Sequence, residues 1–405
     1  MTVSIWQQAH RRRELAYDVV VVGGGIVGCS TAYWLSREHP SLQVALLEAG
    51  ALGAGASGRN AGFVLQGTHT DYHSDTRRYG TRTARRLWAF TRANRDLLVS
   101  ELRGTAFGWR SDGSVTAAGS DEENERLRAS VSALRSAGAP VIHLDASETN
   151  DRLQASGFHG GLLVTIGATV DPLRLVHHIA ERSDADVYAQ HPVRRVLWRG
   201  QAVHLVAPTR CFRADRVVLA VGPSLPTLIP ATSAYVRPVR AQMLATAPAE
   251  TPRVPVPVYS HNGGFYVRQL QDGRLLAGGG RHPHREAEAT DTDSTTPAVQ
   301  ATIERYLHTY FPWTPPLEIA QRWSGTMGFS PDGRPVVGRV PGHPEGVFAT
   351  GFTGHGMGYG FRIGRLLATL VADDERPKSF DLFAASRFEA PEAAAPHDAS
   401  QTRAE

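Results

Sequence analysis

The chain has 405 residues, of which 41% are hydrophobic and 20% charged, with a formal net charge of +4. This length exceeds what one core usually supports, so we expect two domains. No apolar run reaches the roughly 18 residues of a membrane span, and residues 1–13 do not show a secretory signal pattern. The scattered basic residues form no nucleic-acid-binding motif. Only two cysteines are present, which excludes a disulfide framework and favours a reducing cytoplasm.

The first predicted elements form a βαβ unit. Residues 17–22 are apolar and β-branched, which is typical of a buried parallel strand. A glycine run follows, residues 26–37 carry apolar side chains at helical spacing, and residues 43–47 predict a second strand that closes on Glu48. This order is typical of a Rossmann-type domain.

Further helices and strands are predicted along the rest of the chain. The Asp171-Pro172 pair is an N-cap followed by proline at the first helical position. Helices are expected from Ser57 and at residues 81–102, 121–137, 172–182, 297–310 and 361–371. Strands are expected as a meander at 187–212, as a buried strand at 216–221, as an antiparallel sheet at 236–280 and as a strand at 347–350.

The glycine run has the spacing of a dinucleotide-binding loop. Gly23 permits a tight turn, Gly25 lets the backbone approach a pyrophosphate, and Gly28 lets the helix pack closely on the sheet. The start of this helix, at Ile26 and Val27, offers free N–H groups to an anion. Glu48 lies twenty residues after Gly28, where an acid accepts hydrogen bonds from ribose hydroxyls and disfavours NADP. The dinucleotide is therefore NAD or FAD.

Two later segments favour FAD. Residues 54–62 supply small side chains and free backbone N–H groups against which an isoalloxazine ring can lie, through Ala56, Ser57, Arg59, Asn60, Ala61 and Gly62. Residues 348–358 again read strand, glycine turn and helix, and a helix start at Gly354, His355, Gly356 and Met357 would stabilise negative charge on a reduced flavin.

These segments resemble the D-amino acid oxidase superfamily of FAD enzymes, which includes glycine oxidase, sarcosine oxidase and γ-glutamylputrescine oxidase. The Gly-Ala-Ser-Gly-Arg-Asn segment is most similar to the last of these. The resemblance implies an α/β fold, with a Rossmann-type FAD domain assembled from separated segments and a substrate domain built on a large mixed or antiparallel sheet. It also implies that Val193 contacts the adenine through its backbone and that Gly222 borders the cofactor. The resemblance implies that the FAD domain consists of residues 14–80, 150–225 and 322–385. The substrate domain would consist of residues 81–149 and 226–321, and residues 1–13 and 389–405 would be flexible tails.

The resemblance implies oxidation of a C–N bond in an amine or amino acid. Hydride leaves the C–H carbon for flavin N5, and the resulting imine hydrolyses in water, so no protein base is required. Sarcosine oxidases attach FAD to a cysteine at the position that Gly325 occupies here. The two cysteines are Cys29 and Cys211, so we expect non-covalent FAD. No histidines lie at ligand spacing with cysteines or carboxylates, and no metal site is predicted.

Candidate catalytic residues come from the predicted substrate sheet and from the glycine turn Gly354-His355-Gly356, which we call the flavin turn. They are Tyr266, His261, His355 and Met327, with His355 acting mainly through its backbone. Met327 occupies the position where glycine oxidase has a carboxylate-binding arginine, which favours an amine over an α-amino acid. Arg240, Arg268 or Arg281 could replace that arginine, or each could form an ion pair within the protein.

Several alternatives stay open. Lys378 is the only lysine among the 43 basic residues, and Leu276 stands where several family oxidases place a lysine that activates oxygen. The electron acceptor is therefore oxygen or another compound, in an oxidase or a dehydrogenase. A flavin-binding subunit of a larger dehydrogenase and an NAD-dependent enzyme are further hypotheses. The sequence leaves the substrate and the oligomeric state open.

Overall fold

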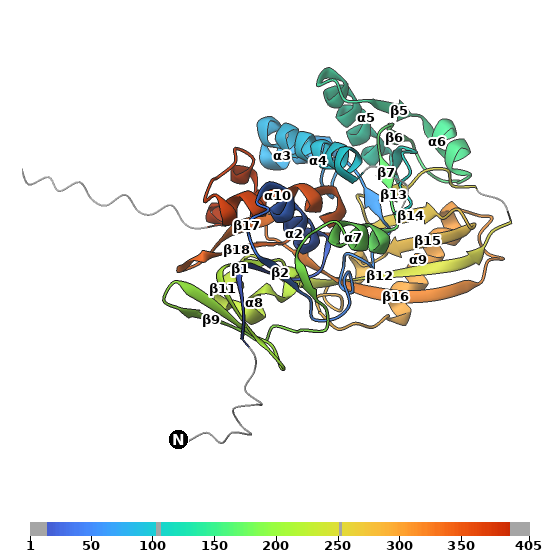
Figure 1. Cartoon of the computed structure of the whole chain (residues 1–405). Coiled ribbons are helices and arrows are strands. Elements are labelled where there is room, and N and C mark those ends of the chain that lie inside the picture. The colour runs from blue at the N-terminus through green and yellow to red at the C-terminus, as the bar shows by residue number, and fades with distance from the viewer. Residues whose placement is uncertain (1–13, 103–106, 251–252, 389–405) are drawn as a thin grey trace, which may run out of the picture.

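The structure, a computed structural model, describes residues 14–102, 107–250 and 253–388, and the predicted tails lie outside them. Two eight-stranded sheets form its framework, and helices cover them (Figure 1). The first sheet lies to the left in Figure 1 and the second to the right. Both sheets mix parallel and antiparallel neighbours, which confirms the predicted α/β class with a Rossmann-type part and a large mixed sheet.

The first sheet has the strand order β17-β18-β11-β1-β2-β8, with β10 paired to β11 and β9 paired to β10. Its strands are β1 (Glu14–Val22), β2 (Val44–Leu47), β8 (Asp186–Tyr188), β9 (Arg195–Arg199), β10 (Ala202–Val206), β11 (Cys211–Leu219), β17 (Val336–Val340) and β18 (His343–Thr350). Strand β1 pairs in parallel with β2 and β11, and Val20 and Val21 are fully buried. The prediction of a buried parallel strand followed by a helix is confirmed.

Two helices cover one face of this sheet. Helix α2 (Ile26–Glu38) packs against α10 (Gly356–Ala372), and the two lie together in Figure 1. A Cβ atom at Gly364 would lie 2.4 Å from Ser30 Cβ, so glycine permits this close helix contact. Helix α4 (Thr81–Leu102) also packs on α10, and α7 (Pro172–Ala180) packs on α2. Helices α2 and α10 therefore lie side by side on the first sheet.

The second sheet has the order β16-β12-β15-β14-β13-β4-β6-β5. Its strands are β4 (Ser114–Ala117), β5 (Val141–Leu144), β6 (Gly161–Val164), β12 (Arg237–Pro248), β13 (Val258–Ser260), β14 (Phe265–Gln269), β15 (Arg274–Gly279) and β16 (Ile319–Phe329). The remaining helices are α3 (Tyr72–Tyr79), α5 (Asp121–Ser136), α6 (Ala146–Leu153), α8 (Leu225–Leu228) and α9 (Pro297–Tyr310), and β3 (Phe63–Val64) pairs with β7 (Ala168–Thr169). Helix α9 packs on β12 and β15.

Most predicted elements are confirmed. Helices α4 and α9 have the predicted bounds, and Asp171 caps α7 by accepting from the backbone N–H groups of Leu173 and Arg174. The helix expected from Ser57 is wrong, because residues 51–58 form successive turns. The domain division stays a prediction, and its boundary at residue 322 falls inside β16 of the second sheet. No helix in the described ranges is long and apolar enough to span a bilayer.

Candidate functional site

Helix α2 begins with backbone N–H groups that have no acceptor. The N–H of Ile26 donates to Ser57 Oγ over 2.9 Å, whereas those of Gly25, Val27 and Gly28 make no hydrogen bond within the described residues. A Cβ at Gly28 would lie 1.8 Å from the carbonyl oxygen of Gly23, so the loop closes tightly on the helix only with glycine there. Three N–H donors at a helix start form a binding site for the phosphates of a dinucleotide.

Glu48 is held at the carboxyl end of β2. Its Oε2 accepts from the N–H of Gly24 over 2.6 Å, and its Oε1 accepts from that of Gly50 over 2.8 Å. The N–H of His191 donates to the carbonyl of Glu48, which brings the segment of Val193 beside it. The N–H of Val193 has no acceptor in the described part of the chain. An acid so placed beside the glycine loop fits a ribose, and the free N–H fits an adenine edge.

The segment from residue 54 to 62 is fixed by its own side chains. Asn60 Nδ2 donates to the carbonyls of Ala56 and Ser57 over 2.9 Å each, and Asn60 Oδ1 accepts from the N–H of Gly62 over 2.7 Å. The N–H groups of Ala56, Ser57, Asn60 and Ala61 have no acceptor among the described residues. Arg59 points away toward the second sheet, where its guanidinium donates to Asp293 and to the carbonyl of Ser324. The segment thus offers backbone rather than side chains to a ring.

The start of α10 is a second set of free donors. Within the described residues, the N–H groups of Gly354, Gly356 and Met357 have no acceptor, and Gly354 adopts a φ of 83°. Gly222, with a φ of 58°, has no atom within 4 Å of the place a Cβ would take, so it borders open space. These donors, together with the first loop and Glu48, fit FAD, which needs a pyrophosphate site, a ribose acceptor and a donor for its flavin ring.

An aromatic wall lies opposite the flavin turn. Phe63 contacts Tyr259 edge-on at 5.2 Å between ring centroids, and Tyr259 lies 5.9 Å from Tyr266. They belong to a cluster that also contains Ala61, Leu65, Met243, Leu276 and Trp323. Burial raises the pKa of Tyr259 and raises that of Tyr266 to about 12, so both phenols stay protonated. An apolar wall with two neutral hydroxyls suits a small organic substrate.

Of the other predicted catalytic residues, His355 contacts this wall and Met327 lies beside the turn that carries His355. Met327 of β16 lies against the flavin turn, its sulfur 3.4 Å from the place a Cβ of Gly354 would take. His355 stacks on Tyr259 with 5.7 Å between ring centroids. His261 does not join them, because its Nε2 pairs with Tyr310 and its Nδ1 with Ser260 beside α9. The structure therefore places His355 against Tyr259 of the wall and Met327 beside Gly354, the residue before His355.

Two partly buried histidines, His69 and His355, lie near Tyr259, with 6.5 Å between their ring centroids. The Nδ1 atoms of His69 and His355 are buried and have no hydrogen-bond partner among the described residues. Burial lowers the pKa of His69 to about 4 and that of His355 to about 3, and in His355 the charge of His69 adds to the effect. Both imidazoles are therefore neutral at pH 7. The sequence analysis predicted His355 as a site residue because it lies in the flavin turn. It did not predict His69, which is part of no motif or periodic pattern.

These depressed pKa values predict acid sensitivity. Below the unfolded pKa of about 6.5, the unfolded chain takes up protons that folded His69 does not, so stability present above pH 6.5 is lost as the pH falls toward 4. Between pH 6.5 and pH 5, the loss of folding free energy from His69 amounts to about 2 kcal/mol. We expect the melting temperature to fall less between pH 7 and 5 in His69→Asn than in the parent. His308→Asn, at an exposed position, is the control, and equal slopes in all three proteins would contradict the prediction.

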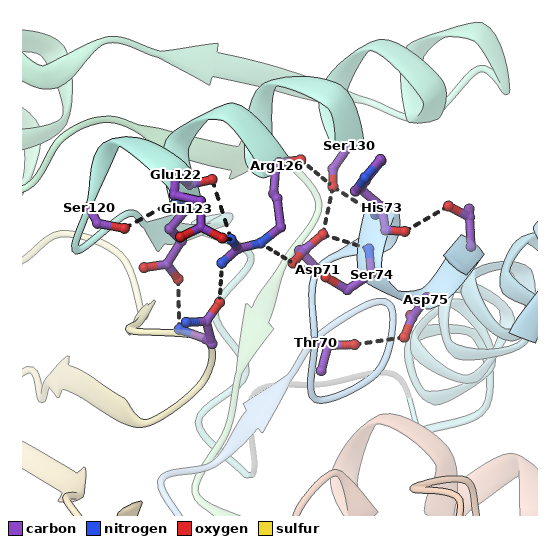
Figure 2. A network of polar contacts seen from close by, with 12 residues as sticks. Thr70, Asp71, His73, Ser74, Asp75, Ser120, Glu122, Glu123, Arg126 and Ser130 are labelled. Carbon is purple, nitrogen blue, oxygen red and sulfur yellow. Dashed lines mark hydrogen bonds and ion pairs between the residues drawn. The ribbon is translucent and has the colours of Figure 1, made fainter. Parts of the chain in front are cut away.

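A cavity of about 70 Å³, lined by both apolar and polar side chains, borders His69, His355 and Tyr259. Two more lining side chains, Gln66 and Trp88, have a buried polar atom without a partner within the described ranges. The network in Figure 2 forms one side, where Arg126 contacts Asp71 and Glu122 and the N–H of Asn262 donates to Glu123. This cavity extends the space beside the flavin turn with groups that can accept or donate hydrogen bonds.

The three candidate arginines differ in whether the protein itself supplies hydrogen-bond acceptors for their guanidinium groups. Arg240 is 5% exposed and donates two hydrogen bonds, of 2.7 and 2.9 Å, to the buried carboxylate of Glu288. Arg268 donates to the carbonyls of Ala61 and Val170. Both guanidinium groups are therefore occupied by the protein. The guanidinium of Arg281 makes no hydrogen bond or ion pair among the described residues, and it lies 4.5 Å from the ring centroid of Phe329.

Comparisons with known proteins show the family and the fold of the chain. The family model described as "DAO: FAD dependent oxidoreductase" matches residues 18–370. The probable oxidoreductase OrdL of Rhizobium meliloti (strain 1021) is 28% identical over 87% of this chain and 82% of its own. One of the subunits of opine oxidase from Agrobacterium tumefaciens (strain Ach5) is 26% identical over 93% of this chain and 99% of its own. The crystal structure of glycine oxidase from Geobacillus kaustophilus has the same fold, with a TM-score of 0.79, 24% identity and coverage of 93% of this chain and 100% of that chain.

Proposed function

Because the chain belongs to the DAO family of FAD-dependent oxidoreductases, we propose that it oxidises a C–N bond of an amine or amino acid, using FAD bound without a covalent link. One observation carries the proposal: the wall of Phe63, Tyr259 and Tyr266 lies beside the turn where α10 presents its free N–H groups. A substrate between them would have an apolar surface on one side and the flavin on the other.

The residues of this chain would act by binding and orientation. Bound FAD supplies the acceptor for the hydride that leaves the C–H carbon beside nitrogen. The N–H groups at the start of α10 would stabilise negative charge at the flavin ring, and the wall would exclude water from the reacting carbon. The neutral imidazole of His355 and the hydroxyls of Tyr259 and Tyr266 would hold the substrate nitrogen by hydrogen bonds. Hydrolysis of the imine then needs only water.

The absence of a suitable cysteine supports non-covalent binding. Cys29 is fully buried in α2, where burial raises the pKa of its thiol to about 12. Gly325, at the family's attachment position, lies against Arg59. Acid precipitation should therefore leave FAD in the supernatant, and flavin remaining with the precipitated protein would contradict this.

Two observations bear on which compound takes the electrons from the reduced flavin. Leu276 packs in the aromatic cluster where an oxidase of this family would place lysine, which favours a dehydrogenase with an acceptor other than oxygen. The similarity to one of the subunits of opine oxidase favours a role as the flavin-binding member of a larger enzyme. Either way the first half-reaction at this site would be the same.

The first test is anaerobic reduction of the FAD-bound protein. Polyamines, N-methyl amino acids and D-amino acids are added in turn and the absorbance of oxidised flavin is followed. We expect bleaching by at least one class of primary or secondary amine. A protein that carries FAD and is bleached by none of them would contradict the proposal.

A second test separates the two acceptors. We expect turnover with an artificial dye to exceed turnover in air by at least about tenfold. The reason is that Leu276 replaces the lysine whose positive charge would help the reduced flavin react with oxygen. Hydrogen peroxide formed under air at the rate of dye reduction would instead show an oxidase.

A further inference from the structure

Buried polar atoms without a hydrogen-bond partner gather around one cavity. Five such side-chain atoms occur in the described part of the chain, and four of them belong to side chains that line the cavity of about 70 Å³: Gln66 Oε1, His69 Nδ1, Trp88 Nε1 and His355 Nδ1. Each has lost its hydrogen bonds to water without a replacement from the protein, which is costly. One water needs about 10–15 Å³ of cavity volume, so the space can hold a group of several atoms. Their concentration at one place indicates a binding site for a polar group.

The side of the cavity away from the flavin turn is held in a fixed shape. The turn between β13 and β14 lines it with Asn262 and Gly263, whose φ angles of 55° and 75° lie in the left-handed region. The N–H of Asn262 donates to Glu123 Oε1 over 2.7 Å, and Arg126 donates to the side-chain oxygen of Asn262. Both partners belong to α5, in the network of Figure 2. The cavity is therefore shaped before a ligand arrives, which lowers the entropic cost of binding.

The charged side chains that line the cavity are already occupied. Asp71 accepts from the N–H and the hydroxyl of Ser74 over 2.9 and 2.7 Å, and Arg126 Nε lies 3.7 Å from its Oδ2. Glu123 accepts a backbone N–H at each oxygen, over 2.8 and 2.7 Å. Among the described residues that line the cavity there is no arginine or lysine. The cavity therefore disfavours an anion, and its unpaired atoms belong to uncharged groups.

Trp88 and Gln66 define which group complements them. The indole N–H of Trp88 can only donate. The amide of Gln66 turns its Nε2 toward the carbonyl of Ile166, 3.5 Å away, which leaves Oε1 as an acceptor. An ammonium group cannot accept from Trp88, and a carboxylate cannot donate to Gln66. A carboxamide does both, and the neutral imidazoles of His69 and His355 can take either role.

We infer that this cavity binds an uncharged group that both donates and accepts hydrogen bonds, such as a carboxamide, at the end of the substrate away from the C–N bond that is oxidised. The inference rests on the proposed function and narrows its substrate class. His355 and Tyr259 line the cavity and also form the flavin turn and the aromatic wall, so the two spaces share these side chains. The amide oxygen of the ligand accepts from Trp88, and its amide nitrogen donates to Gln66.

The test compares amines that differ only at the end opposite to the amino group. They are 4-aminobutanamide, its nearly isosteric alkyl analogue 4-methylpentan-1-amine, 4-aminobutanoate and 1,4-diaminobutane. Calorimetry gives their Kd values for the FAD-bound protein kept reduced with dithionite, so that no amine is oxidised. We expect 4-aminobutanamide to bind at least about tenfold more tightly than each of the others, because only this compound pairs both Trp88 and Gln66.

Two variants assign the binding to the cavity. Trp88→Phe removes the N–H and keeps an aromatic ring, and Gln66→Leu removes the acceptor at similar volume. Each should weaken the binding of 4-aminobutanamide by about tenfold or more and should not weaken that of 4-methylpentan-1-amine. Gln321→Leu, at an exposed position of β16, is the matched control and should change neither affinity by more than about threefold. Because Trp88→Phe and Gln66→Leu remove unpaired buried atoms, both should fold like the parent.

Three results would overturn the assignment. If the parent binds 4-aminobutanamide and the alkyl analogue equally, the cavity holds water only. If 1,4-diaminobutane or 4-aminobutanoate binds more tightly than the amide, the cavity takes a charged group. If the losses in Trp88→Phe and Gln66→Leu do not exceed that in Gln321→Leu, the amide binds elsewhere. The comparison of ligands in the parent needs no variant.

The outcome is separable from that of the proposed function, because a reduced flavin accepts no hydride. If amines bleach the oxidised flavin but the affinities ignore Trp88 and Gln66, C–N oxidation stands and the subsite fails. If the affinities depend on these two side chains but no amine or amino acid bleaches the flavin, the subsite stands and the proposed reaction fails.

Discussion

Gly28→Ala should abolish FAD binding. The added Cβ would lie 1.8 Å from the carbonyl oxygen of Gly23, and this contact is with backbone, which cannot rotate away. The start of α2 must therefore move off the loop, and the free N–H groups of Gly25, Val27 and Gly28 lose their common direction. Losing two or three charge-assisted hydrogen bonds to phosphate costs about 3–5 kcal/mol, which weakens FAD affinity by about 100-fold or more.

Gly138→Ala is the control for this prediction. Gly138 lies in the turn after α5, outside the segments assigned to FAD, is exposed, and has no atom within 4 Å of its Cβ position. We expect it to purify with as much FAD as the parent. Titration of the apoprotein with FAD, followed by quenching of flavin fluorescence, gives the affinities. An affinity for Gly28→Ala within about threefold of the parent would contradict the assignment of the α2 start as the phosphate site.

Arg240→Met should be the most destabilising single change at the second sheet. It would leave the Glu288 carboxylate, which is fully buried, without its charge partner, and breaking a buried pair in this way costs about 3–5 kcal/mol. Gln242 Nε2 donates to both oxygens of Glu288 but carries no charge to offset it. We expect a lower melting temperature at fixed excess FAD.

Two further variants test this reasoning. Arg237→Met changes an exposed arginine on the same strand, and we expect less than about 0.5 kcal/mol of change. Arg240→Met with Glu288→Leu removes both charges and should recover much of the lost stability, because the uncompensated charge causes most of the loss. A double variant as unstable as Arg240→Met alone would show that the packing of the arginine, and not its charge, stabilises this region.

The cofactor FAD and the βαβ unit around the glycine loop could be predicted from the sequence. The glycine loop, Glu48 and the turn before α10 are local signals, because each consists of a few neighbouring residues at a strand or helix end. Such signals do not depend on how distant segments pack. The same locality explains the correct bounds of α4 and α9 and the cap at Asp171, which is set by residues two and three positions later.

The residues on the substrate side of the site could not be predicted from local sequence patterns. Phe63, Tyr259 and His69 come from a two-stranded sheet, a short strand and a loop, and only tertiary packing brings them together. The helix expected from Ser57 was wrong because the Asn60 side chain satisfies the carbonyls of Ala56 and Ser57 and fixes a turn instead. The roles of the three arginines depended on partners 48 or more residues away, such as Glu288 for Arg240.

The most direct test of C–N oxidation at this site is the rate of anaerobic flavin reduction by one amine that bleaches the protein, compared with the same amine carrying deuterium on the carbon beside nitrogen. Hydride transfer from that carbon predicts a slower reduction with the deuterated compound, at equal affinity for both. Equal rates under saturating substrate, or FAD-bound protein that no amine or amino acid reduces, would contradict the proposed reaction.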